Sequence, residues 1–327
     1  MILVIGGAGY IGSHMVRCLL QHREDVLVMD NLGNGHRDAL LGAKLIEADL
    51  RQREQLDRLL HDHAVECIIH FAAYASVGDS VKNPSKYYEN NVAGCFNLLE
   101  AMRTHKINKL IFSSSAAVYG EPVTVPIPED HPKNPTNPYG ETKWVMERML
   151  QWYGQAYGMR SVSLRYFNAA GADPEGLIGE DHDPEEHLIP VAILAALGKR
   201  DKLKIFGTDW DTPDGTCIRD FVHVSDLAEA HFLALQALRN GARTNAYNLG
   251  NGQGFSVKEV IGAVQKVIGR TVPVEAAPRR PGDPARLIAG SQRAKAELGW
   301  NPQYPEIEVI IQHAWAWRKS MPNGYRS

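Results

Sequence analysis

A tyrosine and a lysine four residues apart form the pair in this sequence best suited to acid–base chemistry. They occur in Pro138-Tyr139-Gly140-Glu141-Thr142-Lys143, where a proline precedes a run with helical periodicity. Residues four apart share one face of a helix, so we expect Tyr139 and Lys143 one turn apart. An ammonium group beside a phenol favours the phenolate and lowers the phenol pKa from about 10. The pair therefore predicts a base that can take a proton from an alcohol.

Three serines precede this pair at the end of an apolar run. Leu110 to Phe112 reads as a strand that continues into Ser113, Ser114 and Ser115. Hydroxyl groups at the carboxyl end of a parallel strand face the ligand side of the sheet. Only one of the 12 tyrosines, Tyr139, has a lysine four residues later. Such pairs are common by chance, and the serine run makes this one more specific.

A glycine-rich turn at the start of the chain predicts that a ligand with a pyrophosphate group binds near this base. Met1 to His14 reads MILVIGGAGYIGSH, a buried strand that runs into Gly6, Gly9 and Gly12 and then into a helix. These glycines allow a tight turn, a close approach of a pyrophosphate, and close packing of the helix on the strand. The free N–H groups and the dipole of the helix favour phosphate at this end.

An acid at the end of the next strand narrows the choice of cofactor. The apolar run that follows Asp25 ends on Asp30, 18 residues after Gly12. A carboxylate that binds an adenosine ribose is expected about 20 residues on. The same charge would repel a 2′-phosphate, so the sequence favours NAD over NADP.

Apolar strand-like runs alternate with segments long enough for crossover helices. This alternation predicts an α/β fold with a parallel sheet covered on both faces. A chain of 327 residues exceeds the usual single core. We therefore expect an NAD-binding domain over 1–175 and a smaller substrate lobe over 176–327, with segments near 218–250 packing back on the first domain. The expected strands are 2–5, 26–29, 44–48, 66–72, 109–113 and 161–167, and the expected lobe helices are 188–198, 256–268 and 306–318.

Two polar residues near strand ends leave alternatives open. Asp49 could accept a hydrogen bond from an adenine amino group, or it could cap the next helix. His70 lies within an apolar strand, where a packed histidine is a simpler interpretation than a catalyst. The helix after Pro138 carries Tyr139 and Lys143 on one face and is expected to bury another. The residues expected on that buried face are Val145, Met149, Trp152, Tyr153 and Ala156.

Composition excludes several classes of partner. The net charge of −3 and the isoelectric point near 6.5 argue against nucleic acid or an anionic membrane as the main partner. The longest apolar stretch, Leu188 to Leu197, is too short to span a bilayer, and a strand from residue 2 leaves no room for a signal peptide. The four cysteines are scattered without metal-ligand spacing, which fits buried thiols in a reducing cytoplasm and predicts no metal site.

Taken together, these motifs resemble the extended short-chain dehydrogenase/reductases. The segments that carry the resemblance are GGAGYIGSH, Asp30, FSSSAAVYG and PYGETK. Four further strings resemble the UDP-glucose 4-epimerase family within that group, and the resemblance covers nearly the whole chain. They are RYFN (165–168), DGTCIRDFVHVSDLA (214–228), YNLGNG (247–252) and RRPGD (279–283).

The resemblance implies a Rossmann-like doubly wound sheet, tightly bound NAD, a UDP-sugar substrate and a homodimer. It implies that Tyr139 is the base, that Lys143 activates it and holds the NAD ribose, and that Ser115 polarises the sugar oxygen. The implied NAD site consists of Gly6, Gly9, Tyr10, Ile11, Gly12, Asp30, Asn31, Asp49, Leu50, Phe71, Ala72, Ala73, Asn90, Ser113, Tyr139, Lys143 and Tyr166. The implied substrate site consists of Ser115, Tyr139, Asn168, His187, Leu188, Arg219, Arg280 and Asp283.

The sequence departs from the family pattern at three places. Some members carry a lysine where this chain has Tyr74-Ala75-Ser76, and some carry an asparagine where it has His187. A histidine could donate the same hydrogen bond to a diphosphate. Leu287 stands near the position that gates 2-N-acetyl sugars, where tyrosine narrows the pocket and cysteine opens it. Acceptance of UDP-N-acetylhexosamines or UDP-pentoses therefore stays open.

Three competing functions share parts of these motifs. A sugar-nucleotide dehydratase needs further acids, and related dehydratases place an Asp-Glu pair where this chain has Ala116 and Ala117. A non-catalytic NAD-sensing protein would be expected to have lost the Tyr139–Lys143 pair. A simple sugar-alcohol dehydrogenase would release reduced cofactor. The resemblance favours an isomerase that inverts C4 through a 4-keto sugar.

Overall fold

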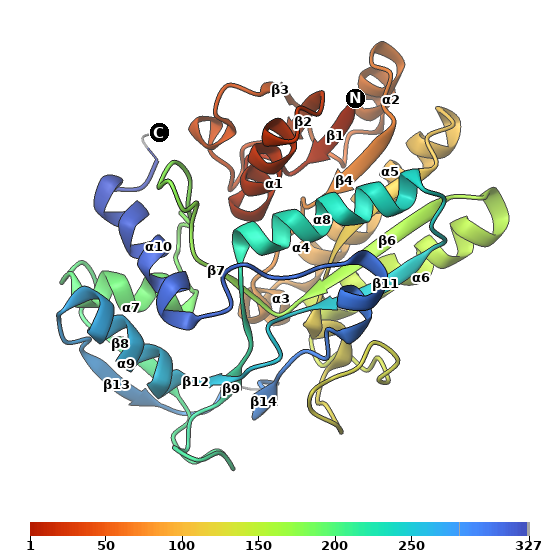
Figure 1. The fold of residues 1–327 in the computed structure, drawn as a ribbon. Coiled ribbons are helices and arrows are strands. Elements are labelled where there is room, and N and C mark those ends of the chain that lie inside the picture. The colour runs from red at the N-terminus through yellow and green to blue at the C-terminus, as the bar shows by residue number, and fades with distance from the viewer. Residues whose placement is uncertain (281, 326–327) are drawn as a thin grey trace.

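A seven-stranded parallel sheet forms the centre of the computed structural model, which describes residues 1–280 and 282–325 (Figure 1). Its strands are β1 (Ile2–Ile5), β2 (Val26–Asp30), β3 (Lys44–Glu47), β4 (Cys67–His70), β5 (Lys109–Ser115), β6 (Arg160–Tyr166) and β11 (Asn245–Leu249). The spatial order is β11-β6-β5-β4-β1-β2-β3, and every neighbouring pair is parallel. The predicted doubly wound α/β fold is confirmed.

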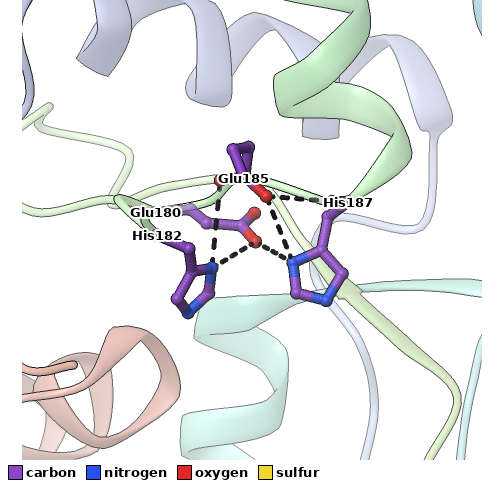
Figure 2. Close-up of side chains that lie close together, drawn as sticks. All are labelled: Glu180, His182, Glu185 and His187. Atoms are coloured by element: carbon purple, nitrogen blue, oxygen red, sulfur yellow. Dashed lines mark hydrogen bonds and ion pairs between the residues drawn. The ribbon is translucent and has the colours of Figure 1, made fainter. Parts of the chain in front are cut away.

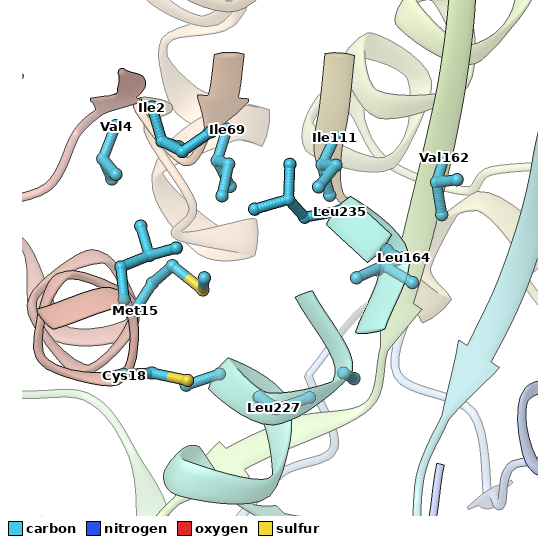
Figure 3. Packing of buried hydrophobic residues seen from close by; sticks show 14 of the residues in the cluster. Ile2, Val4, Met15, Cys18, Ile69, Ile111, Val162, Leu164, Leu227 and Leu235 are labelled. Atoms are coloured by element: carbon cyan, nitrogen blue, oxygen red, sulfur yellow. The ribbon is translucent and has the colours of Figure 1, made fainter. Parts of the chain in front are cut away.

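Helices cover both faces of this sheet because its strands are apolar on both sides. The covering helices are α1 (Tyr10–Gln21) and α8 (Val224–Arg239) on one face, and α2 (Arg53–Asp62), α5 (Gly94–Thr104) and α6 (Pro138–Tyr157) on the other. Successive residues of β1 point to opposite faces, so Ile2 and Val4 enter one core while Leu3 and Ile5 enter the other. Figure 3 shows the first core, where Met15 and Leu235 face the sheet.

The order of the strands reverses at β1, which pairs with β2 on one side and β4 on the other. The carboxyl ends of strands at such a switch point form the crevice where this fold binds ligands. β4 ends at His70, two residues before the predicted end, because the N–H groups of Phe71 and Ala72 both bond to the Ile5 carbonyl. The chain therefore turns at this edge.

The buried face of α6 differs from the predicted one. Lys143, Met146, Glu147 and Leu150 are buried, whereas Trp152 is 62% exposed. Ala156 is also exposed, and Val145, Met149 and Tyr153 are half-buried. The prediction of a buried Trp152 and Ala156 is therefore wrong.

A separate core holds the substrate lobe together. It lies among α7 (Leu188–Ala196), α9 (Val257–Ile268), α10 (Ile307–Ser320), β8 (Leu203–Phe206) and β13 (Val274–Ala277). These helices confirm the three that the sequence predicts for the lobe. Shorter elements are α3 (Val77–Lys82), α4 (Pro84–Tyr87), β7 (Asn168–Ala170), β9 (Ile218–Arg219), β10 (Phe221–His223), β12 (Phe255–Ser256) and β14 (Arg286–Leu287).

The segment near 218–250 returns to the large domain. Its strand β11 pairs with β6 at the edge of the central sheet, and α8 packs against α1. Figure 1 shows α8 lying across the sheet beside α1. The division at residues 175 and 176 stays a prediction.

Within the described residues, no helix combines the length and the apolar character that crossing a membrane requires. All four cysteines are buried and unpaired.

Candidate active site

The glycine turn has the geometry that its sequence predicts. Gly6 has a φ of +78°, and a Cβ there would meet the Ala72 backbone nitrogen at 2.5 Å. A Cβ on Gly12 would overlap the Gly6 carbonyl oxygen, which explains the close packing of α1 against the turn. Gly9 caps α1 without a side-chain hydrogen bond, and a Cβ there would meet only the Gly6 oxygen, at 3.5 Å. The first turn of α1 thus offers backbone N–H groups to an anion, as a pyrophosphate requires.

Asp30 supports this turn from the end of β2. Its carboxylate accepts hydrogen bonds from Ala8 N at 2.9 Å and from Leu32 N at 2.8 Å. Burial raises the pKa of Asp30, against the effect of the backbone N–H groups. Each carboxylate oxygen keeps a further lone pair, so Asp30 can both hold the turn and accept from a ribose hydroxyl.

Replacing Asp30 with asparagine is expected to weaken the preference for NAD over NADP. The change removes the negative charge that repels a 2′-phosphate while it keeps the shape of the side chain. The ratio of the dissociation constants for NADP⁺ and NAD⁺ measures this preference. Asp38→Asn is the matched control, because Asp38 is an exposed acid in the short 3-10 helix that follows β2. An unchanged ratio would assign the discrimination to another group.

Asp49 is held by neighbours on both sides. It accepts from the Arg51 side chain at 2.7 and 3.0 Å and from Asn31 Nδ2 at 3.0 Å. The hydrogen bonds from Arg51 lower the pKa of Asp49. The alternative of a helix cap is wrong, because Gln52 occupies the cap position of α2. Asp49 and Asn31 therefore lie together beyond β3 and β2, and the contact of Asp49 with an adenine stays a prediction.

Tyr139, Ser115 and Lys143 meet at the end of β5. Ser115 Oγ accepts a hydrogen bond from Ala117 N at 3.1 Å, and its side chain opposes the rise that burial causes in the pKa of Tyr139. Lys143 is buried, donates from Nζ to the Ser113 carbonyl at 2.7 Å, and lies 5.8 Å from the centre of the Tyr139 ring. The predicted placement of the pair one turn apart on α6 is therefore confirmed.

The effect of Lys143 on Tyr139 differs from the prediction. Burial raises the pKa of Tyr139, and the Ser115 side chain only opposes this. Burial also lowers the pKa of Lys143 to about 8. The lysine ammonium is directed at a backbone carbonyl rather than at the phenol oxygen. Considering only the groups of the protein itself, the prediction that Lys143 lowers the pKa of Tyr139 is therefore wrong.

A buried ion pair supports the strand that carries these serines. Glu147 of α6 accepts from Arg165 of β6 at 2.5 and 2.9 Å and from Ser114 Oγ at 2.5 Å. Arg165 also donates to the Tyr119 hydroxyl at 2.8 Å. The pair ties α6 to both β5 and β6, and so fixes the distance between Tyr139 and the serine run.

Further residues of the predicted NAD site surround the same edge. The Tyr166 hydroxyl donates to Ser113 Oγ, and Phe71 packs against His231 with ring centres 4.8 Å apart. Asn90 donates to Asn91 at 3.0 Å. The remaining predicted members, Tyr10, Ile11, Leu50, Ala72 and Ala73, lie at the start of α1, after β3 and after β4. His70 is a packed side chain, since it lies 3.1 Å from Cys95 Sγ and burial lowers its pKa to about 3.

The predicted substrate residues form two groups. Asn168 Nδ2 donates to the Asp220 carbonyl at 2.8 Å. Arg219 lies 3.8 Å from Asp283 and donates to the Pro284 carbonyl at 2.8 Å. Arg280 lies instead over the ring of Phe206, 3.8 Å from its centre. Arg219 and Asp283 thus lie close together, whereas Arg280 packs against Phe206 of β8.

His187 and Leu188 lie where α7 begins, with His187 as its cap residue. The side chain of His187 is half-exposed or more, and its Nδ1 lies 2.5 Å from Glu180 Oε1. The neighbouring Glu180 carboxylate raises the pKa of His187. A role for His187 at a diphosphate stays a prediction.

Two structural residues of the site escaped the sequence reasoning. Asp220 is fully buried and accepts from the N–H groups of Asn251, Gly252 and Ala289. Burial raises the pKa of Asp220 to about 6. Asn91 joins the loop at Tyr74 to Thr142 of α6. In the sequence, Asp220 could have been found as an acidic residue next to Arg219 within an apolar run. Asn91 could have been found as one of two consecutive asparagines, Asn90 and Asn91.

Comparison with known proteins agrees with this geometry. A family model described as the NAD dependent epimerase/dehydratase family matches residues 2–250. A UDP-glucose 4-epimerase of Halalkalibacterium halodurans is 55% identical over 324 residues, which cover 99% of this chain and 97% of that protein.

Solved structures give the same result. A crystal structure of a UDP-glucose 4-epimerase, 53% identical, superposes with a TM-score of 0.97 over 100% of this chain and 99% of the other. The UDP-glucose 4-epimerase of Bifidobacterium longum in complex with NAD⁺ and UDP is 38% identical, with a TM-score of 0.94 and 99% of both chains covered. The resemblance found in the sequence is confirmed. The chain, with its glycine turn and its Tyr139–Lys143 pair, belongs to the NAD dependent epimerase/dehydratase family.

Proposed function

We propose that the chain is a UDP-glucose 4-epimerase, which interconverts UDP-galactose and UDP-glucose by transient oxidation at C4 with tightly bound NAD, as in galactose metabolism. This proposal rests on the observation that Tyr139, Ser115 and Lys143 lie together at the end of β5, while the N-terminus of α1 after the glycine turn has no side-chain cap. Full-length relatives named UDP-glucose 4-epimerase support it, as does the related structure in complex with NAD⁺ and UDP.

The proton chemistry falls to Tyr139 and Ser115. The Tyr139 phenolate takes the proton of the sugar 4-hydroxyl, while Ser115 Oγ donates a hydrogen bond to the same sugar oxygen. Bound NAD supplies the hydride acceptor and donor, and its positive charge favours the phenolate. Tyr139 returns the proton when hydride re-enters C4 from the opposite face of the 4-keto sugar. Lys143 binds the cofactor ribose and holds the end of β5 through the Ser113 carbonyl.

Inversion requires that the sugar turn while its UDP stays bound. Arginine forks suit a diphosphate, and a carboxylate suits ribose hydroxyls. Arg219, Arg280, Asp283 and Asn168 would supply these contacts, with Leu188 and His187 at the start of α7. None of these residues belongs to the turn that follows Ser115, near which the sugar would react. Tight binding of UDP is therefore compatible with a sugar that is held loosely enough to turn.

The structure disfavours dehydration at this site. Ala116 and Ala117 follow Ser115 directly in a short 3-10 helix, and Ala117 N is bonded to Ser115 Oγ. A methyl group cannot transfer the C5 proton or assist loss of the C6 hydroxyl. Leu287 of β14 packs near the same turn, against the cluster of Val118, Tyr119 and Ile127, and whether it leaves space for 2-N-acetyl sugars is measured by the substrate range below.

Incubation with UDP-galactose, followed by proton NMR of the sugar, tests the proposal. The expected product is UDP-glucose with no added cofactor consumed and no build-up of free reduced cofactor. A 4-keto-6-deoxy product would show a dehydratase, accumulating reduced cofactor a dehydrogenase, and unchanged substrate a binding protein. A parallel incubation with UDP-N-acetylgalactosamine and a UDP-pentose measures the substrate range.

The proposal includes a homodimer in the cytoplasm. Phe96 of α5 and Trp152 and Tyr157 of α6 are large, apolar and at least half exposed, on two helices joined by the hydrogen bond from Tyr153 to Glu100. Exposed apolar groups gathered on adjoining helices support an interface between subunits. Four unpaired buried thiols support a reducing compartment.

A further inference from the structure

Four potential metal ligands converge in the loop between β7 and α7. They are Glu180, His182, Glu185 and His187, spaced Glu-X-His-X-X-Glu-X-His within eight residues. One ligand atom of each lies within 4.8 Å of those of the other three. Figure 2 shows the two carboxylates and the two imidazole Nδ1 atoms turned toward a common point. This cluster takes no part in the proton chemistry proposed above.

The two carboxylates are buried without a lysine or arginine partner among the described residues. Glu180 is 5% exposed and Glu185 is 8% exposed, and their recorded ion-pair partners are only His182 and His187. Two adjacent buried carboxylates are unfavourable unless positive charge lies between them. A divalent cation with two carboxylates and two neutral imidazoles gives a site with no net charge.

Three atoms at the centre of the cluster are not engaged in a directed hydrogen bond, although His187 Nδ1 lies 2.5 Å from Glu180 Oε1. Glu180 Oε1, His182 Nδ1 and Glu185 Oε2 are buried, and none has a hydrogen-bond partner in the described part of the chain. They nevertheless lie close, since His182 Nδ1 is 3.2 Å from Glu180 Oε1 and 3.8 Å from Glu185 Oε2. Buried polar atoms that approach without bonding are often directed at an ion.

The spacing of these atoms fits tetrahedral coordination. Bonds of about 2.0–2.2 Å to zinc place the ligand atoms about 3.3–3.6 Å apart in a tetrahedron. His182 Nδ1 lies 3.2 Å from Glu180 Oε1 and 3.8 Å from Glu185 Oε2, and His187 Nδ1 lies 3.5 Å from the other Glu185 oxygen, Oε1. The pair of His187 Nδ1 with Glu180 Oε1 is closer, at 2.5 Å. Small shifts of two side chains within this eight-residue segment of the loop would bring the four ligand atoms to tetrahedral spacing.

Groups outside the cluster hold its backbone in place. Arg318 of α10 donates to the Glu180 carbonyl at 3.1 Å, and Arg200 donates to the Glu185 carbonyl at 2.9 Å. The ring of Tyr10, in the glycine turn, meets the His182 ring edge-on at 6.2 Å, and its hydroxyl donates to the Gly171 carbonyl at 2.7 Å. Such outer contacts orient ligands in metal sites.

We propose that Glu180, His182, Glu185 and His187 form a four-ligand site for a divalent transition-metal ion of the zinc type. Four protein ligands close the coordination sphere, so the ion has a structural role. His187 binds it through Nδ1, which leaves Nε2 free for the diphosphate contact proposed above. It fastens the loop between β7 and α7, which joins the edge of the large domain near Tyr10 to the first helix of the substrate lobe. The absence of paired cysteines had led the sequence reasoning to predict no metal site, and the Glu/His spacing was the signal it missed.

Metal analysis of the full-length protein tests this proposal. The protein is stripped with a chelator, reloaded with Zn²⁺, dialysed, and measured by plasma mass spectrometry; one zinc ion per chain is expected. Reloading with Co²⁺ is expected to give the visible absorption of a tetrahedral site with nitrogen and oxygen ligands. Zinc is also expected to raise the thermal unfolding midpoint of the stripped protein.

Variants identify the site. His182→Ala and the isosteric Glu185→Gln are both expected to lose the bound zinc and the zinc-dependent rise in midpoint. His22→Ala is the matched control, because His22 belongs to a second cluster with Cys18 and Glu229, and it is expected to keep both. Circular dichroism shows whether each variant is folded, and the isosteric variant serves if His182→Ala is not.

The proposal is overturned if the reloaded wild-type protein retains no zinc, or if folded Glu185→Gln retains zinc. Loss of zinc in His22→Ala alone would move the site to the other cluster and would also contradict it. None of these readouts uses epimerase activity, so the outcome is independent of the function proposed above.

Discussion

Tyr139→Phe is expected to lower the turnover number for UDP-galactose by about a hundredfold to ten-thousandfold, the usual contribution of a positioned acid–base group. The substitution removes only the phenol hydroxyl group, and the ring remains in its place on α6. Binding of NAD is expected to change little, because the glycine turn and Asp30 are untouched. Steady-state kinetics at saturating substrate and the NAD content of the purified protein measure the two effects separately.

Tyr157→Phe is the control for this experiment, because Tyr157 lies on the same helix but is exposed at its end. It is expected to turn over at the wild-type rate. If Tyr139→Phe also keeps a near-wild-type rate, the proton is transferred by another group. If it loses NAD as well as activity, Tyr139 supports the cofactor site rather than the chemistry.

The elements that the sequence predicts best are those fixed by local stereochemistry. The glycine turn required Gly6 at positive φ and no side chain at Gly12, and both requirements are met in the structure. Asp30 follows from the same pattern, because a strand that ends beside the turn places its last side chain there. The strands were predictable because they are buried on both faces and therefore uniformly apolar.

The buried face of α6 was not predictable from apolar periodicity. The sequence reasoning placed Tyr139 and Lys143 on one face and the core on another, whereas both lie toward the sheet. Glu147, four residues after Lys143, continues the same stripe and is buried because Arg165 of β6 lies opposite. From sequence alone, a row of polar residues on a helix is interpreted as the solvent-exposed face, because its partners on other strands are unknown. The apolar face with Trp152 was therefore wrongly predicted to be the buried one.

Contacts between distant segments account for the other differences. Asp220 accepts hydrogen bonds from the N–H groups of Asn251 and Ala289, which lie 31 and 69 residues further along the chain. The cluster of Glu180 and Glu185 with two histidines depends on a loop conformation that Arg318 and Arg200 hold. Spacing along the chain shows which side chains are available at such sites, and tertiary contacts decide which of them meet.

Glu147→Gln is expected to lower the free energy of unfolding by about 3–5 kcal/mol, the usual effect of removing one partner of a buried ion pair. The substitution keeps the size of the side chain, so no cavity forms, but it leaves the Arg165 guanidinium charged and buried with only neutral partners. These partners are the glutamine amide oxygen, the Tyr119 hydroxyl and a backbone carbonyl. Urea unfolding followed by tryptophan fluorescence measures the loss. Asp57→Asn is the control, because its pair with Arg53 is partly exposed on α2 and is expected to contribute less than about 1 kcal/mol.

The double variant Glu147→Gln with Arg165→Met separates the buried charge from the hydrogen bonds. Removing both charges is expected to cost less than Glu147→Gln alone, because no unpaired charge then remains in the core. A double variant that loses as much stability as the sum of the two single changes would show that the pair is not coupled. Because the pair joins α6 to β5 and β6, uncoupled behaviour would also mean that the placement of Tyr139 against Ser115 depends on apolar packing by Met146 and Leu150 instead.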